Sequence, residues 1–420
     1  MKISEDPERT VRRARLTRIP RLFIALAVTT VAAVGCGDVQ PGADSPDRST
    51  STSAVPTTGA SPAASSCAAR VLAGMSRSQR VGQLFMGAVS AGPDATVGSE
   101  RAQVAVLKRH DVGSVILMGP VRSGLSGVRG VVGDIGQLDL SVAHTTVGTL
   151  VATDQEGGQV QQLSGAGFTD IPSAQVQGGW TASRLQQQAA GWAEELHEAG
   201  VRLDLAPIAD VVPVSIGRAN GPIGRYDRQF GSGPETVGGQ DGAFVRGFGQ
   251  AHVLTTLKHF PGLGRVRDNT DTTAGVTDTT LTRDALDLNS FRTGIAAGAR
   301  FVMVSLATYT RIDPAHQAVF STTVIDGMLR KDLGFDGVVV SDDLGNAAAV
   351  QAVPPGRRAL AFLRAGGDLV VTVDTDDVPA MTSAVLDATR SDRVLRTRVD
   401  ASVRRVLAAK QAAGLMTCPA

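Results

Sequence analysis

Short runs of apolar and β-branched residues recur along the chain from residue 84 onward, and a longer segment with helical periodicity follows each run. The runs are continuously apolar rather than alternating, which is typical of strands in a parallel sheet buried on both faces. Eight runs are therefore predicted to be strands, at residues 84–89, 112–119, 149–154, 201–207, 253–260, 300–306, 337–343 and 368–374.

The segments between these runs carry helix signals. In residues 181–200, an apolar residue recurs every three or four positions, at Leu185, Ala189, Trp192 and Leu196. Thr181 or Ser183 is a candidate N-cap, and Gly200 is a candidate stop. An amphipathic helix packed on a sheet is the expected structure.

Strands that alternate with helices predict an α/β fold, and a single (β/α)8 barrel of the TIM type closes eight parallel strands most simply. An open, doubly wound sheet is the alternative. No linker interrupts residues 67–420, so this range is predicted to be one barrel domain without a second sandwich domain. In a barrel, functional polar residues are expected at the carboxyl ends of the strands.

The first 66 residues differ in composition from the rest. A basic segment leads into apolar residues 22–35, a run shorter than the ~20 residues that span a bilayer. Because "AVGC" at 33–36 resembles a bacterial lipobox, residues 1–35 are predicted to be a lipoprotein signal peptide and Cys36 to be lipidated. An ordinary cleaved signal is the alternative. Residues 36–66, rich in Ser, Thr and Pro, are predicted to be a disordered tether.

These features predict an exported protein, anchored by lipid at the outer face of the cell membrane. In an oxidising compartment, Cys67 and Cys418 are predicted to form a disulfide, with two separate buried thiols as the alternative. The net charge is +1, but residues 1–21 hold seven Lys/Arg against three Asp/Glu, which leaves −3 on the remainder. Without a basic surplus or an aromatic-basic repeat, nucleic acid is not an expected partner.

Polar residues end four of the predicted strands. They are Asp154 in the third, Lys258 and His259 in the fifth, Asp342 and Asp343 in the seventh, and Asp374 in the eighth. Carboxylates after an apolar run are costly to bury unless they are paired or used, although one of the two adjacent aspartates could be only a helix N-cap. Neighbouring strand residues point to opposite faces, so Lys258 and His259 can share a pocket only where the backbone departs from strand geometry.

Three segments resemble motifs of glycoside hydrolase family 3 β-N-acetylglucosaminidases of the NagZ type: "DQEGG" at 154–158, "KHFPGLG" at 258–264 and "SDDLG" at 341–345. The similarity covers about residues 75–410 in the same order, and with the lipobox it is greatest to actinobacterial LpqI-like lipoproteins. The resemblance implies a retaining, exo-acting enzyme that hydrolyses terminal β-linked N-acetylglucosamine from peptidoglycan fragments. It implies no metal or cofactor, and a monomer is expected.

The family pattern also implies roles for individual residues. Asp342 is the implied nucleophile, and Asp343 is then a local structural residue. The residues implied to bind the sugar are Asp154, Arg228, Lys258 and His259. The lysine and the arginine are expected to keep the nucleophile ionised by lowering its pKa.

The chain departs from the family where the acid/base is expected. Relatives carry Asp-Ser-His four residues after the "KHFPGHG" motif, whereas this chain has Asn269, Thr270 and Asp271. Asp271 is expected to be the acid/base, with a pKa raised by loop closure and by the nearby nucleophile. In a second hypothesis Asp268 or His316 supplies the proton. In a third the acid is lost, leaving a slow enzyme or a muropeptide-binding lipoprotein.

Other chemistries on the same barrel remain open at this stage. An ionised Asp271 would repel a phosphate acceptor, so hydrolysis is expected over phosphorolysis, although Arg265 and Arg267 could screen this repulsion. A different β-glycosidase and a lyase that forms a Schiff base on Lys258 are further alternatives. Gln159 and Gln162 replace arginines that help hold the substrate in relatives, which leaves the contacts of the second sugar open.

Overall fold

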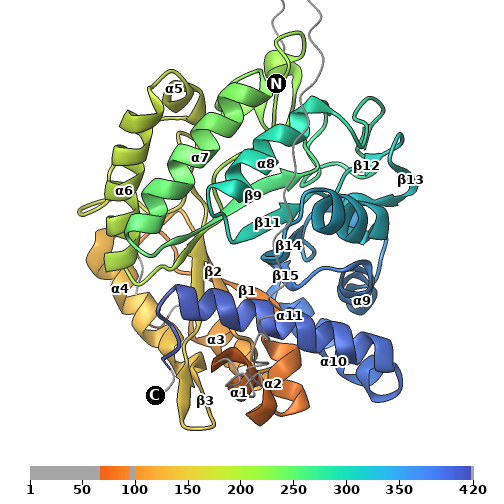
Figure 1. Cartoon of the computed structure of the whole chain (residues 1–420). Coiled ribbons are helices and arrows are strands. Elements are labelled where there is room, and N and C mark those ends of the chain that lie inside the picture. Colours follow the sequence, from red (N-terminus) through yellow and green to blue (C-terminus); the bar gives the residue numbers. More distant parts are fainter. Residues whose placement is uncertain (1–66, 95–97, 99, 418–420) are drawn as a thin grey trace, which may run out of the picture. The chain divides into compact units, whose positions relative to one another are not determined.

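The computed structural model describes residues 67–94, 98 and 100–417. Within these residues, eight parallel strands close into a barrel and neighbour one another in chain order (Figure 1). The strands are β1 (Phe85–Ser90), β2 (Ser114–Met118), β5 (Leu150–Thr153), β8 (Leu203–Asp204), β9 (Leu254–Phe260), β11 (Phe301–Val304), β14 (Val338–Asp343) and β15 (Leu369–Thr372). Each predicted run supplies one barrel strand, so the single (β/α)8 barrel is confirmed and the open sheet is wrong.

Helices surround the barrel, as expected for parallel strands joined by crossover connections. The helices between strands are α3 (Arg101–Arg109), α4 (Gly124–Ile135), α5 (Ala174–Gly178), α6 (Ala182–Glu198), α7 (Pro234–Gln250), α8 (Asn289–Ala296), a π-helix (Thr323–Asp332) and α9 (Pro355–Ala365). Two helices precede the barrel, α1 (Cys67–Gly74) and α2 (Arg77–Gly82), and two follow it, α10 (Val378–Ser391) and α11 (Arg393–Ala412).

Helix α6 forms as its periodicity predicts. The Thr181 side chain accepts a hydrogen bond from the Arg184 amide, and the apolar residues of the predicted stripe are buried. Strand β8 spans only two of the predicted residues 201–207, although the amides of Arg202 and Leu205 also donate to carbonyl oxygens of β5. The periodicity therefore located both elements, but not the bounds of the strand.

The inside of the barrel is filled by apolar side chains rather than by a channel. Met86, Ile116, Leu203 and Phe301 belong to one buried cluster that also includes Val406 and Ala409 of α11. Helix α11 thus covers the amino-terminal end of the barrel. The carboxyl end is left for the loops that follow the strands.

Three small sheets extend the connections between barrel strands. They are the hairpins β3 (Leu140–Val142) with β4 (Thr145–Val147) and β6 (Gln155–Gly157) with β7 (Val160–Gln161), and the sheet of β10 (Thr277–Asp278), β12 (Thr308–Tyr309) and β13 (Asp313–Gln317). The second hairpin and the three-stranded sheet follow the carboxyl ends of β5, β9 and β11, so they build the functional end of the barrel.

Several predictions concern residues that the structure does not describe. The signal peptide at 1–35, the lipidated Cys36, the tether at 36–66 and Cys418 lie outside the described residues. Cys67 is disulfide-bonded, and its pairing with Cys418 stays a prediction. Within the described residues, no helix combines the length and the apolar character that a membrane span requires.

Candidate active site

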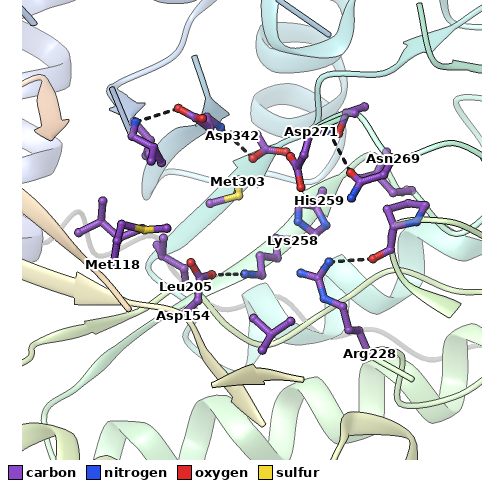
Figure 2. A pocket seen from close by; sticks show the side chains of 18 residues that line it. Met118, Asp154, Leu205, Arg228, Lys258, His259, Asn269, Asp271, Met303 and Asp342 are labelled. Carbon is purple, nitrogen blue, oxygen red and sulfur yellow. Dashed lines mark hydrogen bonds and ion pairs between the residues drawn. The ribbon is translucent and has the colours of Figure 1, made fainter. Parts of the chain in front are cut away.

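A pocket opens at the carboxyl ends of the barrel strands (Figure 2). Ile116, Met118, Leu205 and Met303 contribute apolar walls, and polar side chains converge from several strand ends. The structure brings together in this pocket all six residues predicted to act on the substrate: Asp154, Arg228, Lys258, His259, Asp271 and Asp342. This convergence follows from the barrel, because the carboxyl ends of parallel strands meet at one end of the fold.

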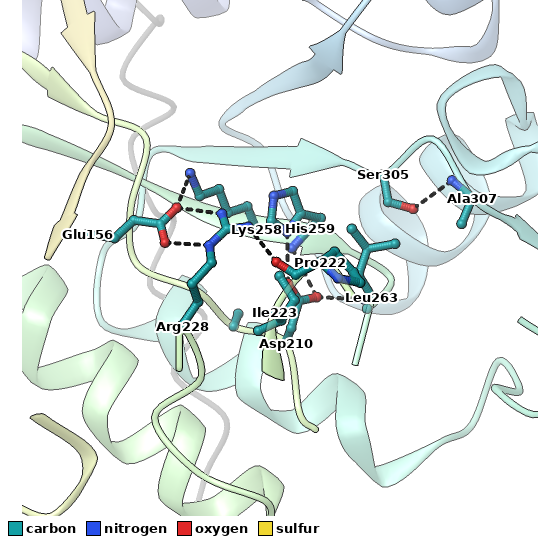
Figure 3. A network of polar contacts seen from close by, with 12 residues as sticks. Glu156, Asp210, Pro222, Ile223, Arg228, Lys258, His259, Leu263, Ser305 and Ala307 are labelled. Carbon is teal, nitrogen blue, oxygen red and sulfur yellow. Dashed lines mark hydrogen bonds and ion pairs between the residues drawn. The ribbon is translucent and has the colours of Figure 1, made fainter. Parts of the chain in front are cut away.

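A network of ion pairs forms one side of the pocket (Figure 3). Lys258 Nζ lies 2.5 Å from Asp154 Oδ1 and 2.7 Å from Glu156 Oε1. Arg228 donates to both oxygens of Glu156, through Nε at 2.8 Å and Nη2 at 2.7 Å. A bidentate pair of this kind fixes the orientation of both side chains. The network therefore ties together the segment after β5, strand β9 and the loop that carries Arg228 at one side of the pocket.

The charges in this network stabilise one another. Burial, the largest influence, would raise the pKa of Glu156, but the charges of Arg228 and Lys258 lower it to about 2. Burial would likewise lower the pKa of Lys258, yet Asp154 and Glu156 raise it. Glu156, Lys258 and Arg228 are consequently charged at neutral pH, and each of the two cations already has a carboxylate partner.

Lys258 and His259 line the same pocket although they are adjacent on β9, and the peptide between them is cis. His259 Nδ1 lies 2.8 Å from Asp210 Oδ2. Asp210 Oδ1 also accepts from the His259 amide at 3.2 Å and from the Leu263 amide at 2.7 Å. Because the carboxylate partner occupies Nδ1, the other ring nitrogen, Nε2, remains for the pocket.

Asp342 stands at the end of β14 and faces the pocket (Figure 2). Its Oδ1 accepts a hydrogen bond from the Asp343 amide at 2.8 Å. Burial raises the pKa of Asp342 to about 6, with a further rise from the charge of Asp271 and an opposing effect from His259. The expectation that a lysine and an arginine lower this pKa is wrong, because Lys258 and Arg228 are directed at Asp154 and Glu156.

Asp343 has the structural role that was predicted for it. Its Oδ1 accepts from the amides of Gly345 at 2.8 Å and Val373 at 2.9 Å, and its Oδ2 accepts from the Asn346 amide at 2.9 Å. The side chain therefore holds the turn after β14 and leaves Asp342 as the aspartate directed at the substrate position.

Asp271 lies beside Asp342 in the pocket, on the loop after β9 (Figure 2). The Asp271 amide donates to Asn269 Oδ1 at 3.0 Å. The carbonyl oxygens of Thr270 and Asp271 accept from the amides of Ala349 and Ala348, at 3.1 and 3.0 Å. The loop is thus attached to the segment that follows the strand of Asp342, and Asp271 stays solvent-exposed rather than enclosed.

The other candidates for the proton donor lie elsewhere. His316 is 60% exposed and pairs with Asp313 at 3.1 Å, and neither His316 nor Asp268 lines the pocket. Arg265 pairs with Asp287 at 2.7 Å, outside the pocket. Of the three proposed donors, only Asp271 is placed where a proton could reach the substrate.

Two residues of the site, Glu156 and Asp210, were not predicted from the sequence. Glu156 lies two positions after Asp154, a spacing that places both carboxylates on one face of an extended segment. Asp210 follows the fourth apolar run, where barrel residues with a function are expected. The spacing of Glu156 and the position of Asp210 both indicated a role. The sequence did not show which cation or histidine each carboxylate contacts.

Comparisons with known proteins agree with this geometry. Residues 78–409 match the model of the glycosyl hydrolase family 3 N terminal domain. A beta-hexosaminidase from Stenotrophomonas maltophilia (strain K279a) is 38% identical over 244 residues, which cover 56% of this chain and 70% of the relative.

Two solved structures extend the similarity over most of the barrel. A beta-N-acetylhexosaminidase from Beutenbergia cavernae DSM 12333 is 43% identical with a TM-score of 0.77, and the match covers 80% of this chain and 99% of that one. M tuberculosis LpqI is 28% identical with a TM-score of 0.67, over 80% of this chain and 94% of that one. The chain therefore belongs to glycosyl hydrolase family 3.

Proposed function

We propose that this chain is a retaining exo-β-N-acetylglucosaminidase that removes terminal β-linked N-acetylglucosamine from peptidoglycan fragments by hydrolysis. The observation that carries this proposal is the placement of Asp342 and Asp271 side by side in one pocket, next to the network around Lys258. The names of the relatives, beta-hexosaminidase and beta-N-acetylhexosaminidase, support the same substrate class.

In the first step, ionised Asp342 attacks the anomeric carbon, while the protonated Asp271 carboxyl donates its proton to the glycosidic oxygen and the bond to the leaving sugar breaks. In the second step, Asp271 accepts a proton from water as that water attacks the anomeric carbon. The bond to Asp342 breaks, and the sugar leaves with its original configuration.

The surrounding groups position the terminal sugar. Asp154 keeps one oxygen, Oδ2, available for sugar hydroxyls while Oδ1 is held by Lys258. The pocket encloses about 210 Å³, below the ~300–1,000 Å³ of pockets for drug-sized ligands. This size suits one sugar ring and favours action at a chain end.

We also propose that water, not phosphate, is the acceptor. When the acceptor attacks, Asp342 is bonded to the sugar and carries no charge, but Asp154, Asp271 and Asp343 also line the pocket, and the cations there are paired with carboxylates. A phosphate dianion is repelled by such a surface. N-acetylglucosamine 1-phosphate that accumulates in phosphate buffer would contradict this proposal.

The proposed location is the outer face of the cell membrane, through a lipid on Cys36. The lipobox-like "AVGC" supports this location, and it is consistent with a substrate released from the wall. Radiolabelled palmitate should enter the full-length protein and not a Cys36→Ser variant. Equal labelling of both proteins would exclude Cys36 as the lipidated residue.

The central test uses an aryl β-N-acetylglucosaminide. Proton NMR should show the β-anomer of the free sugar as the first product, and a fluorinated slow substrate should leave a covalent adduct on Asp342 that mass spectrometry locates. An α-anomer as first product would overturn retention. Absence of turnover with measurable binding would favour a non-catalytic receptor.

A further inference from the structure

A second charged site lies at the other end of the barrel, beside α11. Two cavities of about 290 and 240 Å³ share Arg405 in their walls. The cations that line them are Arg300, Arg330, Lys331, Arg398, Arg404 and Arg405. Arg300 directly precedes β11 and Gly337 directly precedes β14, so the cavities lie at the amino-terminal ends of the strands, away from Asp342.

Carboxylates balance only half of this charge. Asp326 and Asp336 line the cavities, and Asp368 is fully buried beneath them. Asp368 accepts from Arg330 and, at 3.0 Å, from Arg405. Six cations against three carboxylates leave three positive charges on a chain whose total formal charge is +1. The excess is thus concentrated in one small region.

Several of these cations keep hydrogen-bond donors for a ligand. Arg300, Lys331 and Arg404 are exposed, and none of them forms an ion pair within the described part of the chain. Arg398 donates to Asp326 through Nη2 alone, and Arg405 donates to Asp368 through Nη1 alone. The remaining nitrogens of both guanidinium groups are directed to no protein acceptor among the described residues. Such groups bind phosphate oxygens in a bidentate manner.

We propose that the two cavities bind a phosphodiester-linked polyanion, with one phosphate in each cavity. Two adjacent hollows that share a wall arginine suit a flexible chain with repeated phosphates, because successive phosphates can enter both at once. Since the active site opens at the opposite end of the barrel, a bound polymer leaves the pocket accessible to substrate.

The test is a titration of the full-length protein with a fluorescein-labelled poly(glycerol phosphate) oligomer, followed by fluorescence anisotropy. A double variant, Arg300→Glu with Arg404→Glu, removes two exposed cations that have no ion pair, so the fold should be kept. Binding should weaken roughly tenfold or more, as expected for lost charge-assisted contacts. Hydrolysis of the aryl glycoside should stay at the level of the unmodified protein.

A matched control carries the same change in total charge, Arg109→Glu with Arg393→Glu, at exposed positions outside both cavities. This control should bind like the unmodified protein. If both double variants bound the polymer equally weakly, the polymer would be responding to the total charge of the protein. That result would contradict a binding site at the two cavities. Binding of inorganic phosphate without any gain for the polymer, or binding only to vesicles of anionic phospholipid, would also overturn it.

Discussion

The two ends of the barrel each hold an ionisable side chain with a shifted pKa, and they use it differently. At the carboxyl end, burial raises the pKa of Asp342 to about 6, and the carboxyl faces a pocket. At the amino end, burial lowers the pKa of Lys410 to about 7, and this fully buried amine donates to Gln83 Oε1 and the Gly113 carbonyl oxygen, both at 2.7 Å.

The difference shows when a shifted pKa indicates chemistry. Lys410 lies on α11, the helix that covers the end of the barrel, and its contacts are the ends of the segments that lead into β1 and β2. Asp342 accepts one amide hydrogen bond, lies beside Asp271 and His259, and lines a pocket that a substrate can fill. A perturbed group is therefore a functional candidate only where it faces a cavity with complementary partners.

The largest expected effect is that of Asp342→Asn. Loss of the nucleophile should lower kcat on an aryl β-N-acetylglucosaminide by roughly 10³-fold or more, because no covalent intermediate can form. The free energy of unfolding at pH 7 should rise in the same variant. Since the folded state raises the pKa of Asp342 from about 4 to about 6, the fold loses stability as the pH rises between these two values, and this loss is complete at pH 7. Asn, which cannot ionise, should therefore gain on the order of 1–3 kcal/mol at pH 7.

The pair of measurements separates catalysis from folding. Thermal unfolding at pH 7 should place the Tm of Asp342→Asn at or above that of the unmodified protein. A strongly lowered Tm together with lost activity would mean that Asp342 is needed for the fold rather than for the reaction.

Asp271→Ala should have the next largest effect, and its size should depend on the leaving group. General acid catalysis contributes ~10²–10⁴-fold, so slow alkyl glycosides and disaccharides should lose this factor. An activated nitrophenyl glycoside leaves without a proton and should lose far less in its first step. Comparable losses on both substrates would instead indicate that Asp271 only holds the loop.

Glu156→Gln should weaken substrate binding more than the chemical step. The change removes the carboxylate that pairs with both Arg228 and Lys258, so the orientation of these two side chains is no longer fixed. Breaking a buried pair costs about 3–5 kcal/mol, which should lower the Tm by several degrees. Steady-state kinetics should show a rise in KM that exceeds the fall in kcat. A selective loss of kcat would give Glu156 a role in the reaction itself.

Lys410→Met should leave the reaction unchanged, lower the stability because two buried acceptors lose their donor, and alter the pH dependence of stability. The folded state lowers the pKa of Lys410, so between about pH 7 and 10 the unfolded chain binds the extra proton and stability rises with pH. The variant should lose this rise, on the order of 1–3 kcal/mol. Unfolding curves at pH 7 and pH 9.5 measure the slope, and turnover should stay within about twofold. An unaltered slope would show that Lys410 is charged in the fold.

The sequence by itself determined the barrel and the membership of the pocket. Continuous apolar runs can be strands only where both faces are buried, and eight of them separated by helices leave few closures. Asp154, Lys258 and Asp342 each stand at or just after the end of such a run, so their convergence followed from the fold. The "KHFPGLG" and "SDDLG" segments then indicated the chemistry.

Only the tertiary structure decided which charges meet. Arg228 and Glu156 are 72 positions apart and Lys258 and Asp154 are 104 apart, so no local pattern pairs them. These contacts direct both cations away from the nucleophile, and burial then dominates the pKa of Asp342. A strand end places a side chain at the pocket, but its ionisation depends on every charge and on the amount of water around it, and those are properties of the folded chain.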